Sequence, residues 1–160
     1  GRNKELIIRG GDNIDPKMIE EPMHLHPAVA LAAAVGRPDA HAGEVPVVYV
    51  QLRPNAQTVP AELMAHACET IAERAAWPKK IVTVDMLPTT AIGKIYKPAL
   101  VQQEIESVFR EEAVQCGVSV MECRAEQDPR LGTVLRWRAE GDLDTLRARL
   151  GGYAFKHQEI

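Results

Sequence analysis

A glycine and a lysine, Gly93 and Lys94, close a loop rich in proline and threonine beyond the middle of the chain. Lysine carries a compact ammonium on a four-carbon stem, so at the tip of a loop it can reach anions such as carboxylates and phosphates. A glycine directly before it lets the backbone turn tightly. The competing interpretation is that Lys94 is one of 19 basic residues and lies on a solvated loop.

A second stretch with possible binding chemistry contains Gly10 and Gly11. These glycines follow the apolar residues 6–8 and precede Asp12 and Asn13. This arrangement is typical of a turn, because glycine adopts positive φ at little energetic cost. The stretch fits neither G-x-G-x-x-G nor G-x-x-x-x-G-K-[ST], so it is weak evidence for a nucleotide-binding loop. An ordinary tight turn is the alternative.

Trp77, Lys79 and Lys80 stand together where a predicted amphipathic helix ends. An indole can stack on a flat ring, and adjacent ammonium groups can meet a phosphate. Cations are also favourable at a helix C-terminus, where a tryptophan can pack on the core. Both interpretations stay open.

Other combinations of reactive residues favour no catalytic centre. His24 and His26 have no cysteine or further histidine at ligand spacing, so we expect no metal site. The adjacent Glu20 and Glu21 are typical of a solvated helix face rather than an acid–base pair. The three cysteines are odd in number and show no C-x-x-C spacing, which argues against a disulfide framework and favours a reducing cytoplasm.

The elements that must position these residues follow from hydrophobic periodicity and turn signals. Asp15 and Pro16 are typical of a helix start, and the apolar residues after Pro60 recur at helical spacing. We expect strands at residues 6–8, 28–35, 45–52 and 80–85, helices over 16–26 and 60–75, and a polar loop at 36–44. The order β-α-β-β-α-β predicts an α+β fold, a small sheet with flanking helices.

The remaining residues predict an appended α-β-β-α unit. We expect a helix over residues 98–115, strands at 118–123 and 133–138, and a helix capped by Asp142. A last strand can start at residues 153–155. Trp137 is interpreted as a packing residue of this unit.

Composition excludes several classes of protein. Hydrophobic residues make up 46% and charged residues 26%, which is typical of a globular chain. A net charge of −3 argues against a general nucleic-acid binder. No apolar run approaches the roughly 20 residues that a membrane span needs, and no signal peptide is recognisable. We expect the chain to begin at a domain boundary.

Two stretches carry a resemblance to a known family. GRNKELIIRGGDNIDP, residues 1–16, resembles the start of the C-terminal domain of acyl- and aryl-CoA synthetases. LPTTAIGKIYK, residues 87–97, is similar to the P-x-x-x-x-G-K loop that closes this domain. Acyl- and aryl-CoA synthetases belong to the adenylate-forming superfamily, which also includes luciferases and peptide-synthetase adenylation domains. The resemblance implies a C-terminal lid domain over residues 1–103 and an extension of unknown role over residues 104–160.

The resemblance also implies a reaction in two halves. A carboxylate attacks the α-phosphate of ATP to form an acyl-adenylate and pyrophosphate, and a thiol then displaces AMP. Lys94 matches the catalytic lysine, which places a mobile positive charge between the two anions of the first half. Removing such a preorganised charge typically costs about 10²–10³ in rate. The implied cofactors are ATP, CoA and Mg²⁺, the last held by ATP and an N-terminal domain.

Further roles are carried over by position. Arg2 matches an arginine that contacts the nucleotide, and Lys4 matches the hinge whose backbone torsion changes as the lid rotates. Gly10 and Gly11 match glycines beside the tunnel for the pantetheine arm of CoA. For Arg2 and Lys4 the alternative is plain surface charge.

In the same way, Trp77, Lys79 and Lys80 match the place where some CoA ligases touch the CoA nucleotide. There the indole would stack on adenine and the ammonium groups would meet the 3′-phosphate. Lys97 occupies a position where many relatives have a second basic residue, and we expect it to be supportive only.

Three hypotheses follow. In the first, the chain is part of a ligase that joins a small carboxylic acid to CoA, and it is inactive without the N-terminal adenylation domain of the same protein. In the second, the thiol belongs to a carrier protein, which would predict a carrier module downstream; the extension shows no obvious one. In the third, the chain is a stand-alone regulatory or binding module and the Gly-Lys loop is incidental.

Overall fold

The computed structural model of the protein describes residues 5–160, and these residues form two compact units. The first unit comprises the residues up to Gly36 together with Glu44–Leu100. The second comprises Arg37–Gly43 and Val101–Ile160. The first unit thus holds both stretches on which the family resemblance rests, and each unit has its own core.

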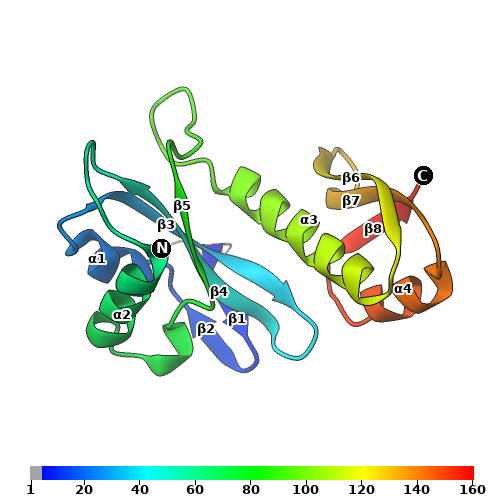
Figure 1. The fold of residues 1–160 in the computed structure, drawn as a ribbon, viewed down its shortest axis with the longest axis horizontal. Coiled ribbons are helices and arrows are strands. Elements are labelled where there is room, and N and C mark those ends of the chain that lie inside the picture. Colours follow the sequence, from blue (N-terminus) through cyan, green and yellow to red (C-terminus); the bar gives the residue numbers. More distant parts are fainter. Residues whose placement is uncertain (1–4) are drawn as a thin grey trace. The chain divides into compact units, whose positions relative to one another are not determined.

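A five-stranded sheet organises the first unit (Figure 1). Its strands follow the order β2-β1-β4-β3, and β5 pairs in parallel with β4. Their bounds are β1 (Ile7–Arg9), β2 (Asp12–Ile14), β3 (Val29–Asp39), β4 (Gly43–Leu52) and β5 (Ile81–Val84). The α+β prediction is therefore confirmed, with one hairpin strand, β2, added to the predicted order.

Two local features of this sheet differ from the sequence prediction. Residues 36–44 were expected to be a loop, but β3 continues to Asp39 and β4 begins at Gly43. The Asp39 carboxylate accepts hydrogen bonds from the N–H groups of His41 and Ala42, at 3.1 and 2.8 Å, which closes a tight hairpin turn. Side-chain acceptors of this kind replace the ladder at a turn, so the strands can run almost to its tip.

Helices α1 (Lys17–His24) and α2 (Pro60–Thr70) complete the first unit. The Asp15–Pro16 pair precedes α1, but Pro16 is the N-cap residue and not the first helical residue that was predicted. The N–H of Lys17 donates to the Asp15 carboxylate at 3.0 Å, and this hydrogen bond lowers the pKa of Asp15. The helix α2 ends at Thr70 rather than near residue 75, because Ile71 is extended and a 3₁₀ turn, η2 (Arg74–Ala76), follows.

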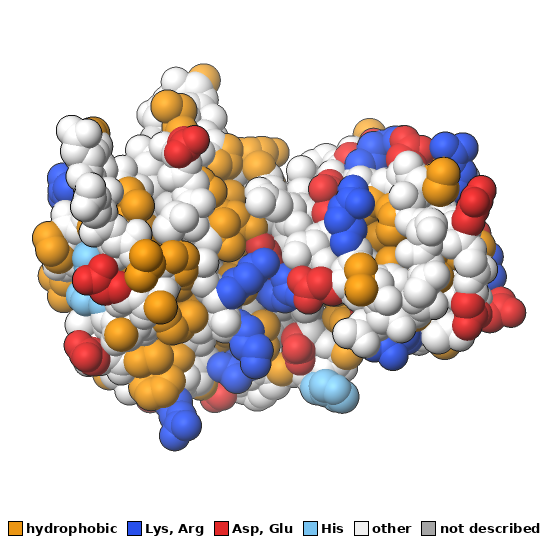
Figure 2. Space-filling model, viewed as in Figure 1, with side chains coloured by type: hydrophobic (Ala, Val, Ile, Leu, Met, Phe, Trp, Pro, Cys, Tyr) orange, Lys and Arg blue, Asp and Glu red, His pale blue; other side chains and the backbone are white. Residues whose placement is uncertain are grey.

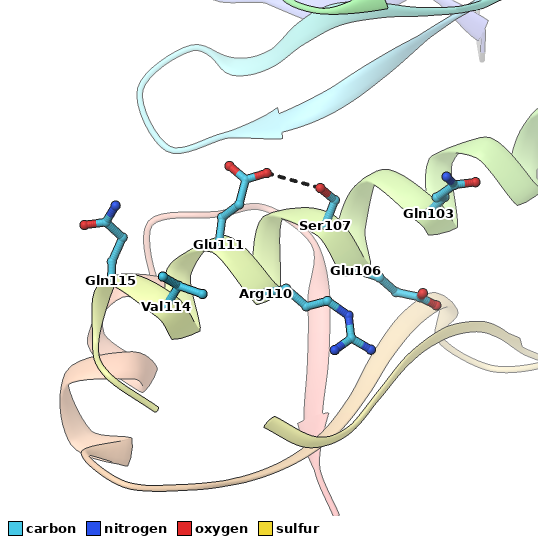
Figure 3. Close-up of a pocket in the computed structure, with 7 residues that line it drawn as sticks. All are labelled: Gln103, Glu106, Ser107, Arg110, Glu111, Val114 and Gln115. Atoms are coloured by element: carbon cyan, nitrogen blue, oxygen red, sulfur yellow. Dashed lines mark hydrogen bonds between the residues drawn. The ribbon is translucent and has the colours of Figure 1, made fainter. Parts of the chain in front are cut away.

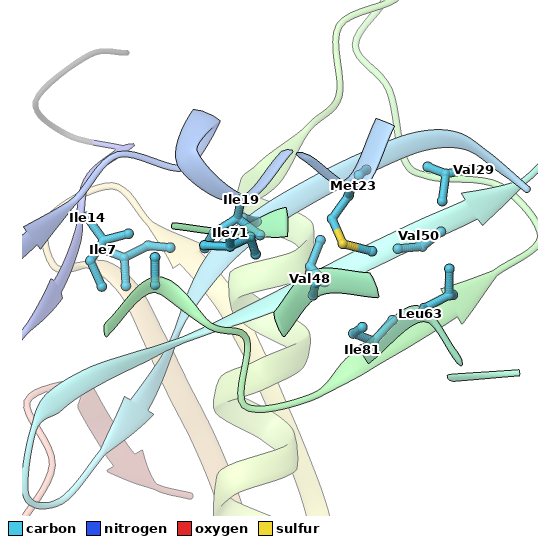
Figure 4. Packing of buried hydrophobic residues seen from close by; sticks show 14 residues of the cluster. Ile7, Ile14, Ile19, Met23, Val29, Val48, Val50, Leu63, Ile71 and Ile81 are labelled. Atoms are coloured by element: carbon cyan, nitrogen blue, oxygen red, sulfur yellow. The ribbon is translucent and has the colours of Figure 1, made fainter. Parts of the chain in front are cut away.

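The core of the first unit gathers aliphatic side chains from the helices and the sheet, as Figure 4 shows. Ile19 and Met23 of α1 and Leu63 of α2 are fully buried, as are Val48 and Val50 of β4. Full burial of such side chains stabilises by about 1.5–3 kcal/mol each, so this largely aliphatic cluster holds helices and sheet together.

The second unit contains a three-stranded sheet in the order β6-β7-β8. Its elements are β6 (Ser119–Asp128), β7 (Gly132–Glu140), α4 (Leu143–Leu150) and β8 (Lys156–Glu159), together with most of α3 (Lys97–Gln115). The strands β6 and β7 are antiparallel, and α4 makes the crossover to β8, which pairs in parallel with β7. The predicted α-β-β-α order is confirmed, and β8 is the last strand.

Trp137 anchors the core of this unit, as predicted. It is fully buried, its ring centroid lies 5.2 Å from that of Phe109, and its indole N–H donates to Nδ1 of His157 at 3.3 Å. Asp142 caps α4 by accepting a hydrogen bond from the N–H of Thr145 at 3.2 Å.

Acidic and basic side chains are interspersed over the visible surface of residues 101–160 (Figure 2). Many of them form ion pairs: Arg136 with Asp128 at 2.7 Å, and Arg149 with Glu112 at 2.7 Å. Because charges of both signs are interspersed over this visible surface, it gives no extended field of one sign. No helix within residues 5–160 is long and apolar enough to cross a membrane.

Candidate functional site

Lys94 lies on the exposed part of the loop that connects β5 to α3 (Figure 1). Residues 89–94 are all exposed, so they take no part in the core. The loop is nevertheless built from its own hydrogen bonds. The N–H of Thr90 donates to the carbonyl of Lys94 at 2.7 Å, and the N–H of Lys94 donates to Oγ1 of Thr90 at 3.2 Å. The lysine therefore stands on a defined turn with its ammonium available to a partner outside the loop.

Gly93 permits that turn. Its φ is +86°, a backbone conformation that residues with a side chain rarely adopt, and its N–H donates to the carbonyl of Thr90 at 2.9 Å. Backbone contacts also join the two arms of the loop. Thr89 and Ile95 form an antiparallel β-bridge, and the N–H of Tyr96 donates to the carbonyl of Pro88 at 2.8 Å. The tip that presents Lys94 is thus a short, backbone-closed hairpin.

The two ends of the loop are fastened to the first unit. At its start, the side chain of Leu87 is 1% exposed, and the N–H of this residue donates to the amide oxygen of Gln51 at 2.8 Å. At its end, the Lys97 ammonium lies 2.8 Å from the Glu20 carboxylate. The interpretation of Glu20 as part of a solvated helix face is therefore wrong, because its side chain is 18% exposed and engaged in this pair.

Gly10 and Gly11 form the turn between β1 and β2. Gly10 has φ +58°, as a tight turn requires. Gly11 has no positive φ, and a Cβ built on either glycine would meet nothing within 4 Å. Packing within the described chain therefore does not explain why position 11 is glycine.

Trp77 follows η2 and packs partly against the core of the first unit. Its indole N–H donates to the carbonyl of Ile71 at 3.0 Å, and the Arg74 guanidinium lies 5.3 Å from the ring centroid. This geometry corresponds to the packing interpretation of Trp77, since the ring already has a cation against it. Lys79 is exposed and its N–H donates to the carbonyl of Pro46 at 2.7 Å, while Lys80 is half-buried.

The structure brings the glycine turn and the tryptophan segment together. The guanidinium of Arg9, beside Gly10, donates to the carbonyl of Ala75 at 2.9 Å, two residues before Trp77. Lys94 lies elsewhere: Figure 1 shows its loop and the β1–β2 hairpin at opposite ends of the first unit. The strand β5 separates the two sets, since residues 80 to 85 span about 16 Å at about 3.3 Å per residue.

Arg2 and Lys4 lie outside the described residues, so their predicted roles stay predictions. Within residues 5–160, no group of three or more His, Cys, Asp or Glu side chains is arranged to hold a metal ion. The described site residues lie on two separate surfaces of the first unit.

A shallow hollow of about 500 Å³ lies along α3, in the second unit, and was not predicted from the sequence. Figure 3 shows its polar side chains, including the hydrogen bond from Ser107 to Glu111. The carboxylate of Glu111 also pairs with Arg37 at 2.7 Å. These groups satisfy one another, which is the pattern of a structural network rather than of a ligand site.

Comparison with known proteins matches most of the first unit to a known family. The sequence profile of the family "AMP-binding enzyme C-terminal domain" matches residues 18–94. The chain is 49% identical over 111 residues to the marinolic acid–CoA ligase of Pseudoalteromonas sp., a match covering 69% of this chain and 17% of that protein. It is 39% identical to the indoleacetate–CoA ligase of Aromatoleum aromaticum, over 70% of this chain and 22% of that protein.

Solved structures give the same result. The crystal structure of an acyl-CoA synthetase from Brucella canis superposes with a TM-score of 0.60 at 34% identity, covering 68% of this chain and 20% of that one. A fatty acyl-CoA synthetase from Mycobacterium tuberculosis gives a TM-score of 0.58 at 32% identity, over 64% of this chain and 20% of that one. The chain thus spans about a fifth of the length of the proteins that it resembles.

Proposed function

The chain belongs, through residues 18–94, to the family of AMP-binding enzyme C-terminal domains, and on this premise we propose that it is the lid domain of an ATP-dependent acyl-CoA ligase. The whole protein would convert a carboxylate, ATP and CoA to acyl-CoA, AMP and pyrophosphate. The relatives named above are CoA ligases of which this chain matches about a fifth, so an N-terminal domain of the same protein would bind ATP and the acid.

The observation that carries the proposal is the placement of Lys94. An exposed ammonium on a backbone-closed turn can enter a cleft of another domain without disturbing the core that holds it. There it would lie between the carboxylate and the α-phosphate of ATP, where two anions must approach. Fixed positive charge at developing negative charge is worth more in such a water-poor cleft than in solution.

The second surface suits the thiol step. The open space beside Gly10 and Gly11 fits the narrow pantetheine arm of CoA. We assign the adjacent Trp77, Lys79 and Lys80 to the CoA nucleotide, with the ammonium groups facing its phosphates. For Trp77, the Arg74 guanidinium against the ring means that adenine would have to use the remaining indole surface.

Two surfaces at opposite ends of one unit cannot face the same cleft together (Figure 1). A rotation of the domain between the half-reactions resolves this, and we assign the hinge to Lys4 and a nucleotide contact to Arg2. Hinges of this kind need only a few residues that absorb φ/ψ change. Mg²⁺ would be held by ATP and the N-terminal domain. The domain itself would span residues 1–103, with residues 104–160 as an extension.

The relatives also indicate what this domain leaves to the rest of the protein. Proteins named for marinolic acid and for indoleacetate, two unlike acids, are both similar to this chain. We therefore place the choice of acid in the N-terminal domain. A carrier-protein thiol in place of CoA is the second candidate, but the named relatives are CoA ligases, which favours CoA.

Two variants of the full-length protein test the proposal. Lys94→Ala should lower adenylation, measured as exchange of labelled pyrophosphate into ATP, by about 10²–10³ and largely spare thioester formation from supplied acyl-AMP. Lys4→Pro should spare adenylation and lower thioester formation, because proline locks φ at a hinge that must change torsion. Equal loss of both half-reactions in the Lys94→Ala enzyme, or loss of neither, would contradict the role of Lys94.

A further inference from the structure

The ion pair between Glu20 and Lys97 joins distant parts of the first unit. One carboxylate oxygen of Glu20, Oε2, lies 2.8 Å from the Lys97 ammonium and accepts a hydrogen bond from the N–H of Ala34 at 2.9 Å. The two charged side chains are 18% and 20% exposed, and Ala34 is 1% exposed in β3. A carboxylate with two partners in a half-buried place is held more firmly than one in a surface pair.

Helix stability does not explain a lysine at this position. Lys97 is the first residue of α3, where the positive end of the helix dipole disfavours a cation. Glu20 lies in the first turn of α1, where an acidic residue is favourable on its own account. The pair therefore gives Lys97 a reason to be basic that its own helix does not.

The position of Lys97 in the loop gives the pair a consequence for Lys94. Residues 89–94 are exposed, so no core contact fixes where they point. Their direction depends on the two ends: Leu87 with Gln51 at the start, and Lys97 with Glu20 at the finish. Two residues, Ile95 and Tyr96, lie between Lys94 and Lys97, so the two lysine Cα atoms are at most about 10 Å apart. Movement at the second fastening therefore shifts the closed hairpin that carries the lysine.

We propose that Glu20 is a positioning residue for adenylation, acting on Lys94 through the Glu20–Lys97 pair. This inference rests on the proposed function, since it assigns a purpose to the orientation of Lys94. When the pair is lost, the end of the loop gains freedom and Lys94 samples positions away from the reacting anions. Misplacement by about 1 Å can cost up to about 10² in rate.

The test uses the full-length protein and substitutions on each side of the pair. Glu20→Gln removes the charge but keeps an oxygen for the N–H of Ala34. Lys97→Met removes the ammonium and leaves the Glu20–Ala34 hydrogen bond intact. We expect each to lower kcat for adenylation by about 10-fold, with little change in KM for ATP and with thioester formation from acyl-AMP within about twofold of wild type. The double variant should be no worse than either single one.

Two controls make the result specific. Glu21→Gln changes the neighbouring carboxylate, which is exposed, and should leave both half-reactions unchanged. Lys97→Arg restores a cation and should recover most of the adenylation rate. Should Glu20→Gln behave like Glu21→Gln, or should both half-reactions fall together, the positioning role is overturned.

Folding and the proposed function are separated from this inference by two further measurements. Thermal unfolding of each variant followed by circular dichroism detects a loss of fold, and if Glu20→Gln unfolds, Lys97→Met decides the question alone. If Lys94→Ala leaves adenylation intact, the proposed function fails. If Lys94→Ala abolishes adenylation while Lys97→Met leaves it at the wild-type rate, only the positioning role fails.

Discussion

Replacing Arg37 by methionine should destabilise the second unit far more than replacing an arginine in a surface pair. Arg37 lies near the end of β3, close to the turn of the β3–β4 hairpin and within that unit, and its guanidinium lies 3.0 Å from Glu104 and 2.7 Å from Glu111. Glu104 is 1% exposed and the Arg37 side chain 14% exposed. Methionine keeps most of the length of the side chain and removes only the charge and its hydrogen bonds.

The magnitude follows from burial. At 3.0 Å and an effective dielectric constant of about 20, the attraction between two unit charges is about 5–6 kcal/mol before desolvation is subtracted. Removing one member of a buried pair costs about 3–5 kcal/mol, because the remaining charge loses its compensation. Glu111 is 62% exposed, so that half of the network adds no more than about 1 kcal/mol. We therefore expect a loss of about 3 kcal/mol.

Urea unfolding of the chain measures this loss. Trp137 is fully buried in the second unit, and a Trp77→Phe background leaves it as the one indole that reports on unfolding. At a slope of about 1–3 kcal/mol per M, a loss of 3 kcal/mol moves the midpoint by about 1–3 M. Arg124→Met is the matched control, since Arg124 pairs with Glu122 and Glu126 where all three side chains are exposed.

A double variant tests the reasoning. In the Arg37→Met background, Glu104→Gln removes the charge of the buried carboxylate and should recover about 1–2 kcal/mol. A strong effect of burial on the Arg37 pair is refuted if Arg37→Met costs no more than Arg124→Met. It is refuted equally if Glu104→Gln deepens the loss instead of relieving it.

Two other predictions address the second unit and the CoA surface. Burial lowers the pKa of His157, and Glu159 opposes this with a smaller effect. The folded state therefore gains stability from neutral His157 above the unfolded pKa of about 6.5, and this stability is lost as pH falls through the lower folded value. Urea midpoints should therefore fall less between pH 7.5 and 5 in His157→Gln than in the wild type, whereas the exposed His41→Gln control should keep the wild-type dependence; the same fall of the midpoint with pH in His157→Gln and in the wild type would contradict the prediction. In the full-length protein, CoA should protect Lys79 and Lys80 from an acylating reagent, whereas the exposed Lys17 of α1 should stay reactive. Peptide mass spectrometry measures the modification of each lysine. If CoA protects neither Lys79 nor Lys80, this segment does not bind the CoA nucleotide.

Local patterns predicted most of the elements. The helix starting near Asp15, the strands around residues 45–52 and 81–84, and the cap at Asp142 all agree with the structure. Where the prediction was wrong, a local signal was overridden. The apolar spacing after Pro60 continues to Ala75, but the chain leaves the helix at Ile71, whose carbonyl accepts the Trp77 indole N–H. Helical spacing alone cannot register that contact.

The candidate site divides in the same way. Lys94, Gly10 and Gly11 were identified from short motifs, because a turn and the residue that it presents are encoded within a few positions. Glu20 was misread as solvated because nothing near it in the chain indicates a partner. Only the fold brings the first turn of α1 to the end of the Lys94 loop.

Residue types and spacing by themselves determined the class of the fold, the order of its elements apart from β2, and the identity of the presented lysine. Those properties rest on φ/ψ preferences and periodicities that extend over a few residues. The tertiary structure alone decided that the glycine turn and the Lys94 loop lie at opposite ends of one unit. It also decided that the end of the hairpin with Arg37 belongs to the second unit. Pairs such as Glu20 with Lys97 and Arg37 with Glu104 join residues far apart in the chain, and no local pattern records them because their proximity exists only after the sheets and helices have packed.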